Sequence, residues 1–198
     1  MVEALSPPSR PTRRMIIGIS GATGIAYSVE LLRVLRQLGI QTHLVVTTAG
    51  EQTRAHETSL TAKELRSMAD VVYSIRDVGA AIASGSFRTM GMIVAPCSIR
   101  TLSEIATGVT STLLTRAADV CLKERRRLVL LVRETPLHRG HLKSMLAVTD
   151  AGGIIMPPVP AFYLRPKTIE EVVQHTVARA LDLFELDDGS SPRWGEES

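Results

Sequence analysis

The sequence predicts an α/β protein with one doubly wound parallel sheet in a single domain. Short runs of Val, Ile and Leu alternate along the chain with stretches of helical periodicity. Continuous apolar runs of this kind are typical of parallel strands that are buried on both faces. The segment Gly18–Gly24, Gly-Ile-Ser-Gly-Ala-Thr-Gly, joins the first apolar run to the first helical pattern. Such a sheet binds its ligands at the carboxyl ends of its strands.

The expected elements alternate regularly, and no internal repeat is visible. The strands are expected at Met15–Ser20, Gln41–Val46, Asp70–Ser74, Gly91–Ala95, Arg127–Val132 and Gly153–Met156. The helices are expected at Ile25–Leu38, Ala62–Ala69, Leu102–Thr107, Leu113–Glu124, His138–Asp150 and Ile169–Leu186. This alternation predicts βαβ units and therefore a parallel sheet.

The domain is expected to span residues 15–186. Residues 1–14 contain Pro7, Pro8 and Pro11 and are predicted to be a flexible tail, and residues 187–198 an irregular C-terminal segment. Translation from Met1 and from Met15 are both compatible with the pattern, because Met15 directly precedes the first strand.

Composition narrows the function classes. The chain has 198 residues, 44% of them hydrophobic, which suits one globular domain. Aromatic residues make up only 4% and the net charge is +3, so we expect no nucleic-acid partner. No apolar run reaches the roughly 20 residues of a membrane span. Cys97 and Cys121 are too few for a disulfide framework and lack metal-ligand spacing, so we expect a cytoplasmic protein without a metal.

The Gly18–Gly24 turn has the features of an anion cradle. Glycines allow the backbone to approach an anion closely, and the amides at the start of the following helix face it. The hydroxyls of Ser20 and Thr23 add donors. Such a turn also closes ordinary α/β units, so by itself it is a weak signal.

Donor side chains follow the other strands. Those after the second, fourth and fifth strands are Thr47 and Thr48, then Cys97, Ser98, Arg100 and Thr101, then Arg133 and Glu134. Together they suit a phosphate and the polar edge of a planar ring. No carboxylate stands about 20 positions after the glycine turn, where an NAD ribose site needs one. FMN therefore fits better than NAD.

Several segments in order resemble the UbiX-type flavin prenyltransferases. They are Gly18–Gly24, Ser84–Ser86, Pro96–Ser98, Thr115–Asp119, Leu122–Arg126, Val132–Pro136 and Met156–Tyr163, and the likeness runs from Met15 to about Trp194. The resemblance implies a flavodoxin-like, Rossmann-like fold in a homo-oligomer, a dodecamer built from trimers, with active sites at subunit interfaces. It also implies that dimethylallyl monophosphate alkylates reduced FMN at N5 and C6, without a metal. The product, prenylated FMN, would serve a UbiD-type decarboxylase.

The resemblance also implies roles for individual residues. The FMN-binding positions are Gly21, Ala22, Thr23, Thr47, Ser98, Ile99, Arg100, Thr101 and Arg133. The positions that hold the prenyl phosphate are Tyr163, Arg179, Arg116 and Lys123. The positions that line the reacting centre are Glu57, Ser86, Glu134 and Trp194. Thr23 and Thr47 stand where Ser is more usual, and Thr48 replaces a frequent Lys.

These residue types suit the implied reaction. Cations and a phenol stabilise a phosphate as its charge develops on leaving. Trp194 and the flavin face would shield an allylic cation by cation–π attraction. Glu134 is the candidate for handling the proton that leaves the flavin ring, alone or through the released phosphate.

Each residue also has an ordinary structural explanation. Arg116 and Arg179 would be common surface cations of helices, and Lys123 a cation at a helix carboxyl end. Tyr163 would anchor a proline-rich loop, and Glu57 would be an ordinary solvent-exposed carboxylate. Cys97 has no base near it in the sequence, so a buried apolar role is preferred to a nucleophile.

Two rival functions stay open on the sequence. One is an FMN-dependent cysteine-type decarboxylase, whose relatives have Pro-Ala-Ser-Ala-Asn-Thr after the fourth strand and a catalytic His upstream. Here the stretch reads Ala95-Pro-Cys-Ser-Ile-Arg-Thr101, and Ile75–Thr89 contains no His. The other is a non-enzymatic FMN-binding electron carrier or subunit of a decarboxylase complex, which would not need the phosphate-binding set. The choice between a monophosphate and a diphosphate donor is also open.

Overall fold

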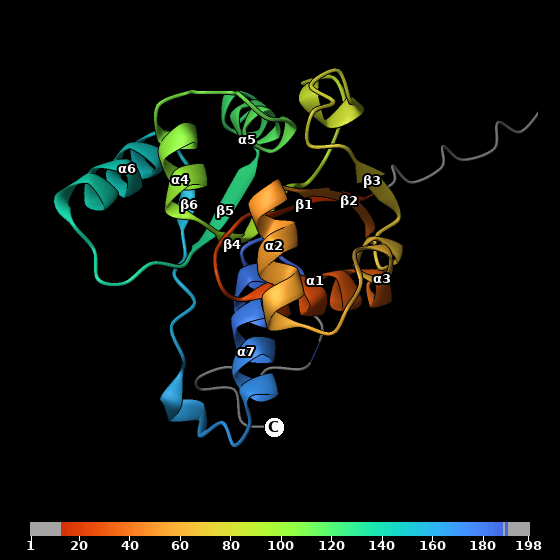
Figure 1. Ribbon diagram of the computed structural model, residues 1–198, viewed down its shortest axis with the longest axis vertical. Helices are drawn as coiled ribbons and strands as arrows, with labels where there is room; N and C mark the ends of the chain where they lie inside the picture. The colour runs from red at the N-terminus through yellow and green to blue at the C-terminus, as the bar shows by residue number, and fades with distance from the viewer. Residues whose placement is uncertain (1–12, 188, 190–198) are drawn as a thin grey trace, which may run out of the picture.

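The computed structural model describes residues 13–187 and residue 189, and they form one parallel sheet between two layers of helices (Figure 1). The first half of the chain forms β1 (Arg14–Ile19), α1 (Ile25–Gln37), β2 (Gln41–Val46), α2 (Thr48–Glu57), α3 (Ala62–Ser67), β3 (Val71–Tyr73) and the 3₁₀ helix η1 (Ala81–Ala83). The second half forms β4 (Gly91–Cys97), α4 (Ile99–Ala106), α5 (Leu113–Lys123), β5 (Arg127–Val132), α6 (Arg139–Asp150), β6 (Ile154–Ile155), the 3₁₀ helix η2 (Phe162–Leu164) and α7 (Ile169–Asp182). The sheet order is β3-β2-β1-β4-β5-β6, and every pairing is parallel. The predicted fold class is confirmed.

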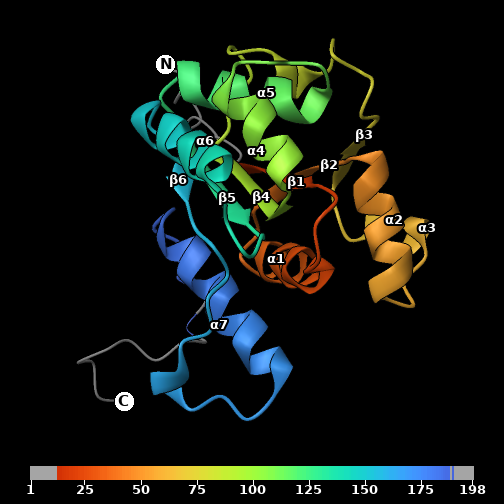
Figure 2. The same cartoon turned by 60° about the vertical axis from the view of Figure 1, so that its left-hand side comes forward.

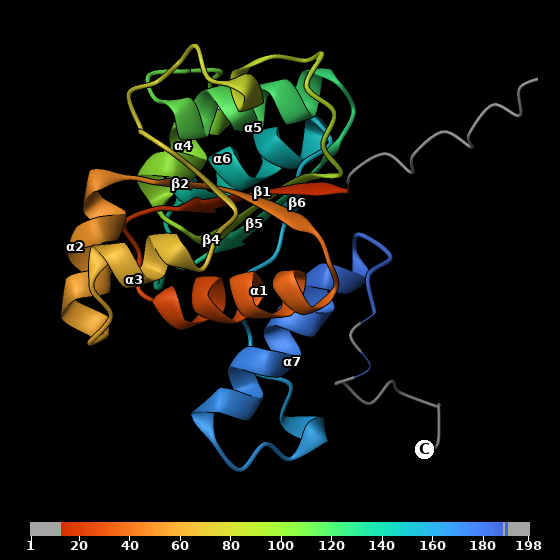
Figure 3. The same ribbon diagram turned by 90° about the vertical axis from the view of Figure 1, so that its right-hand side faces the viewer.

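Helices cover both faces of the sheet, as a parallel sheet requires. Helices α1 and α7 lie on one face and α4, α5 and α6 on the other (Figure 3). The first layer buries Leu31 and Leu181 in one cluster with Ile17 of β1, and the second buries Leu114 and Ala118 against β4 and β5. Strand side chains alternate between the two layers, so that Ile17 joins the first and Ile16 the second. Burial on both faces explains why the strands read as continuous apolar runs.

A bulge interrupts the pairing of β4 with β5 close to the carboxyl edge of the sheet. Val94 lies opposite Leu130 and Cys97 opposite Val132, so three steps along β4 match two along β5. The extra residue falls at Ala95–Pro96, and Pro96 has no N–H to give to the ladder. The bulge leaves the Pro96 carbonyl oxygen to accept bonds from Ser20, which follows β1.

Helix α2 was not predicted, although it carries Glu57. Its sequence, Thr-Ala-Gly-Glu-Gln-Thr-Arg-Ala-His-Glu, has no apolar stripe, and only Gly50 is buried. The helix is stabilised locally: Thr47 caps its start, and Glu51 pairs with Arg54 at 3.0 Å one turn later. A search for apolar periodicity does not detect a helix of this kind.

Other predicted boundaries need smaller corrections. Helix α4 begins at Ile99, not Leu102, because Ser98 caps it, and β4 continues to Cys97. Helix α7 ends at Asp182, not Leu186. Strands β3 and β6 are shorter than expected. Nearly all of the predicted N-terminal tail and C-terminal segment lies outside the described residues.

Candidate functional site

The strand order places a topological switch point at the carboxyl edge between β1 and β4, and we call this point the crevice. From β1 the chain continues outward through β2 and β3, and it returns through β4 to build the other half with β5 and β6. The loops that follow β1 and β4 therefore diverge, and this switch point is where open α/β sheets bind ligands. The predicted flavin loops, Gly21–Thr23 and Ser98–Thr101, lie on its two sides.

Ser20 connects these two loops. Its side chain is buried, its hydroxyl donates to the Pro96 carbonyl oxygen at 3.0 Å, and the same hydroxyl accepts from the Ser98 N–H at 2.7 Å. The Ser20 N–H also donates to Pro96 O at 3.2 Å. The expectation that this hydroxyl serves as a donor to a ligand is wrong, because both of its bonds are made within the protein.

Helix N-termini converge at this edge. The side chain of Thr47 caps α2 by accepting from the Gly50 N–H at 3.0 Å, and that of Ser98 caps α4 by accepting from the Thr101 N–H at 3.3 Å. Ile99, Arg100 and Thr101 form the first turn of α4. These caps explain the two hydroxyls structurally, and they also hold two positive helix ends toward the crevice.

Glu57 is the last residue of α2, and its side chain reaches the N-terminus of α1. Its carboxylate accepts from the Gly24 N–H at 2.9 and 3.1 Å and from the Ile25 N–H at 2.9 Å. Gly24 has φ 115°, a conformation that favours glycine. The amides of Gly24 and Ile25, expected to face a bound anion, are therefore already taken by an anion of the chain. Glu57 is therefore not an ordinary solvent-exposed carboxylate, since it fixes the predicted flavin loop.

The pKa of Glu57 reflects these contacts. Partial burial raises it, but bonds from the Thr23 side chain and from the Ile25 and Gly24 amides, together with the charge of Arg133, outweigh that effect. The net result is a pKa below the ordinary range, so the carboxylate is charged at neutral pH.

Arg133 and Tyr27 adjoin the same loop. The Arg133 N–H donates to Cys97 O at 3.0 Å, which continues the β4–β5 pairing into the loop after β5. The Arg133 guanidinium lowers the pKa of both Glu57 and Tyr27, although burial leaves the Tyr27 pKa raised overall. The Tyr27 ring lies against Gly24, where a Cβ would stand 2.9 Å from its Cδ2. Sequence reasoning missed Tyr27, although its place in the first turn of α1 put it beside the loop.

Glu134 also follows β5. It is exposed, and its Oε1 accepts from the Thr135 N–H at 3.0 Å. Arg100, in contrast, points along α4, where it pairs with Glu104 at 2.9 Å and its side chain is 84% exposed.

Ser86 and Lys123 lie away from this crevice, whereas Arg116 stands in the first turn of α5, which begins beside Ile75 after β3. The Ser84–Ser86 segment precedes β4, and Lys123 ends α5 just before β5 begins, so both belong to the amino edge of the sheet. Because β5 has six residues, the two edges are about 20 Å apart along that strand. Lys123 pairs with Glu124, and Arg116 on α5 pairs with Asp119 at 2.7 Å.

Tyr163 and Arg179 lie in the C-terminal part of the chain, Tyr163 in η2 and Arg179 in the last turn of α7. The start of α7 and η2 extend from the body of the molecule (Figure 2). The Tyr163 residue is 62% exposed, and Arg179 pairs with Asp182 at 3.3 Å. Trp194 lies outside the described residues. One chain therefore brings together the predicted flavin set with Glu57 and Glu134, but not the predicted phosphate set.

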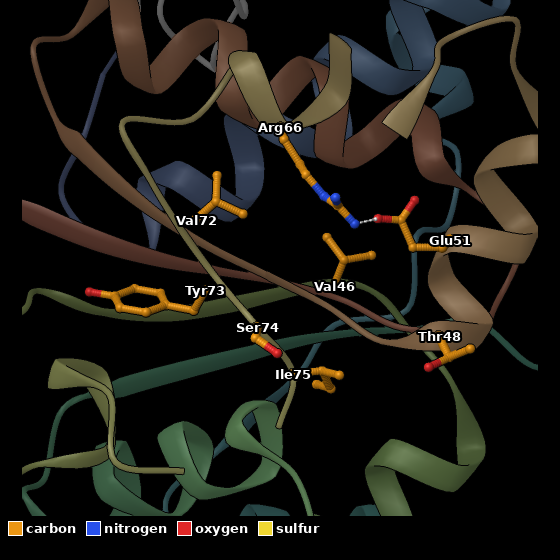
Figure 4. A pocket seen from close by; sticks show the side chains of 8 residues that line it. All are labelled: Val46, Thr48, Glu51, Arg66, Val72, Tyr73, Ser74 and Ile75. Carbon is orange, nitrogen blue, oxygen red and sulfur yellow. Dashed lines mark hydrogen bonds and ion pairs between the residues drawn. The ribbon is translucent and has the colours of Figure 1, made fainter. Parts of the chain in front are cut away.

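A pocket of about 440 Å³ opens one strand away from the switch point (Figure 4). It lies at the ends of β2 and β3 beside α2 and α3, and Val46, Thr48, Val72 and Ile75 line it. Across its rim Glu51 of α2 accepts from Arg66 of α3 at 2.6 Å. The pocket adjoins Thr48 at the start of α2, so it borders the flavin side of the edge rather than the phosphate set.

The two thiols are buried, and the described side chains form no metal site. Cys97 and Cys121 are buried and free, and burial raises the pKa of both thiols, that of Cys121 to about 12. Neither is a ready nucleophile. Within residues 13–187 no group of three or more His, Cys, Asp or Glu side chains is arranged to hold a metal. No helix in the described part of the chain is long and apolar enough to cross a bilayer.

Comparison with known proteins identifies relatives over nearly the whole chain. The family model for flavoproteins matches residues 4–181. A flavin prenyltransferase UbiX of Neisseria meningitidis serogroup B is 54% identical over 92% of this chain and 96% of its own length. The crystal structure of AnUbiX (PadA1) in complex with FMN and dimethylallyl pyrophosphate superposes with a TM-score of 0.93, at 47% identity, and covers 95% of this chain and 100% of that one. A dodecameric FMN-dependent UbiX-like decarboxylase from Escherichia coli O157:H7 gives 0.90 at 45% identity, covering 92% and 100% of the two chains.

Proposed function

This chain belongs to the UbiX family of flavin prenyltransferases, and we propose that it transfers the dimethylallyl group of dimethylallyl monophosphate to N5 and C6 of reduced FMN. The predicted family and enzyme class are confirmed by the relatives. The observation that carries the proposal to specific residues is the crevice at the β1–β4 switch point. The N-termini of α2 and α4, which Thr47 and Ser98 cap, lie at this edge of the sheet. The glycine loop after β1, which Ser20 joins to Ser98, lies there too, and Arg133 follows β5 at the same edge.

The residues at the crevice fit FMN by their chemistry. The backbone of Gly21, Ala22 and Thr23 and the helix ends capped by Thr47 and Ser98 suit a phosphate. The remaining predicted contacts are Ile99, Arg100, Thr101 and Arg133. Arg133 offers a planar set of N–H donors to the polar edge of the ring. When bound in its reduced form, FMN supplies the two nucleophilic ring atoms.

The phosphate set would stabilise the leaving group. As the carbon–oxygen bond breaks, the phosphate keeps the electron pair, and Lys123, Arg116 and Arg179 offset its growing charge while Tyr163 donates a hydrogen bond. The first new bond joins the allylic carbon to N5, and the N5 hydrogen leaves as a proton. The second joins C6 across the remaining double bond, so that one proton is added to the neighbouring carbon and one leaves C6. Glu134, beside Arg133 at the flavin edge, is proposed to handle that proton.

Glu57, Ser86 and Trp194 complete the proposed reacting centre. Glu57 would hold the Gly21–Thr23 loop in place and would keep its own negative charge beside the flavin ring. Because the flavin set and the phosphate set lie at different places in one chain, the proposed site is completed by neighbouring copies in a homo-oligomer. The E. coli relative is dodecameric, and we propose the same assembly here.

The product is proposed to serve a UbiD-type decarboxylase in the cytoplasm. Two free cysteines agree with a reducing compartment. The resemblance favours the monophosphate donor, although the structure of AnUbiX contains the pyrophosphate.

The deciding experiment is an anaerobic incubation of the purified protein with reduced FMN and dimethylallyl monophosphate. The extracted flavin should gain the mass of one dimethylallyl group, inorganic phosphate should appear in equal amount, and the absorption spectrum should change. A parallel reaction with the diphosphate tests donor choice. Unmodified flavin that stays bound to the protein would instead support the non-enzymatic carrier.

A further inference from the structure

The carboxyl end of α5 is held in a fixed shape. The Arg126 N–H donates to Cys121 O at 2.8 Å and the Arg125 N–H to Leu122 O at 3.1 Å, and Arg125 has φ 56°. These are the bonds and the left-handed residue of a Schellman motif. Since that conformation is unfavourable for a residue with a Cβ, the surroundings must hold it. The motif fixes the backbone from which the Arg126 side chain leaves.

The Arg126 guanidinium connects this helix end to the segment before β4. Its Nη2 donates to Gly85 O at 2.6 Å and its Nη1 to Phe87 O at 2.8 Å. The two carbonyls flank Ser86, and both lie about 40 residues from Arg126 in sequence. A planar guanidinium has the fork geometry for two such bonds, which an ammonium group lacks.

The two bonds orient the peptide groups around Ser86. In a trans peptide the N–H points opposite to the C=O. With the Gly85 and Phe87 carbonyls turned toward Arg126, the N–H groups of Ser86 and Arg88 turn away from it, and the Ser86 N–H donates to the Ser84 hydroxyl oxygen at 3.4 Å. The Ser86 hydroxyl lies on the same segment, 2.9 Å from the Ser84 hydroxyl. Arg126 therefore holds the Ser84–Ser86 segment through its carbonyl side, opposite to the side on which its N–H groups lie.

Lys123 lies directly beside this stretch. A Cβ built on Gly85 would stand 2.7 Å from Lys123 Nζ and would also strike Glu124. The segment therefore lies against the ends of the Lys123 and Glu124 side chains, and a methyl group at Gly85 would displace both of them. Phe87 fixes the other side, since its ring packs edge-on against His43 at 5.1 Å.

We propose that Arg126 is a positioning residue for the donor phosphate: it holds the Ser84–Ser86 segment against Lys123 so that one cation and several N–H and O–H donors face the same anion. This inference rests on the proposed function, in which Lys123 and Ser86 act on dimethylallyl monophosphate. Arg126 itself faces the protein backbone, so it acts through these residues.

The test compares Arg126→Lys with Arg127→Lys. Both variants keep the charge, but the Arg127 guanidinium bonds to the exposed Glu185 at 3.3 Å and to no backbone carbonyl of the described residues. Turnover of dimethylallyl monophosphate, inhibition by inorganic phosphate and FMN binding are measured on the assembled protein. For Arg126→Lys, KM and the inhibition constant of phosphate should rise about tenfold, the effect of about 1.4 kcal/mol, while kcat falls less and FMN affinity is unchanged. Arg127→Lys should match the wild type.

Gly85→Ala provides a second test if Arg126→Lys assembles poorly. The added methyl group displaces Lys123, so it should raise the same two constants without changing FMN binding. Wild-type values of KM and of phosphate inhibition in both variants would overturn the proposal, as would a parallel loss of FMN binding, which indicates a general folding role. An inactive wild type would instead refute the proposed function.

Discussion

Replacing Ser20 by Ala removes a side chain that joins the loops on the two sides of the crevice. The hydroxyl is buried and makes two bonds, to Pro96 O and from the Ser98 N–H. Ser28→Ala is a matched control. Ser28 is also buried and donates to Ala95 O, one residue before Pro96, but it does not contact the loop at Ser98.

The size of the effect follows from which groups lose their partners. Pro96 O keeps a bond from the Ser20 N–H, whereas the Ser98 N–H has no second partner among the described residues. An unsatisfied buried donor costs about 1–3 kcal/mol, and the Ser98 N–H is only partly buried, so the low end of that range applies. If FMN binding must restore the loop to its place, a cost of about 1.4 kcal/mol raises the Kd of FMN about tenfold. In Ser28→Ala the loop after β4 keeps its anchor, so the Kd should change less than about twofold, well under 1 kcal/mol.

Titration with FMN, followed by flavin fluorescence or calorimetry, measures both constants. Thermal unfolding of both variants without FMN shows how much each change costs the fold. A wild-type Kd for FMN in Ser20→Ala would refute the reasoning, and so would an equal rise of the Kd in Ser28→Ala. Either result would mean that the Ser20 hydrogen bonds between the two loops do not support FMN binding.

Four further predictions address individual residues. The pKa of Glu57 is lowered in the folded protein, so its carboxylate stabilises the fold above the pKa of the unfolded chain, and this stabilisation is lost as the pH falls through the folded pKa. The difference in unfolding free energy between the wild type and Glu57→Gln should therefore be constant near neutral pH and shrink in acid. Cys97 and Cys121 should resist iodoacetamide at pH 8 until the protein is denatured, and mass spectrometry that finds either one modified in the native protein would contradict their burial. Arg179→Ala should raise KM for dimethylallyl monophosphate about tenfold or more and leave FMN bound, whereas joint loss of FMN would indicate a structural role. Glu134→Gln keeps the shape but not the base, so rapid-quench analysis should show the N5 bond formed and C6 bond formation delayed, and an undelayed second bond would leave the released phosphate as the base.

The sequence by itself determined the sheet, the central strands and the family. Runs such as Leu128–Val132 are apolar because both faces of the sheet are covered, and that pattern is local and visible. The glycine turn and the donors after each strand could be placed at one edge, because parallel strands bring their carboxyl ends together. The absence of a carboxylate after the second strand favoured FMN in the same way.

Only the tertiary structure decided how those donors are used. Ser20 and Thr23 look alike in the sequence. In the fold, however, the Ser20 hydroxyl bonds to Pro96 and Ser98, whereas the Thr23 side chain bonds to Glu57. Helix α2 has no apolar stripe, so neither its existence nor the placement of Glu57 on α1 could be deduced from periodicity.

The separation of Lys123 from Arg133 is also a tertiary fact. Ten positions apart in the sequence, they lie at opposite edges of the sheet, because β5 crosses the whole sheet between them. Contacts between distant segments depend on how strands and helices are packed, and no local pattern records them. For that reason the sequence identified the residue types of the site, and the fold decided which of them meet in one chain.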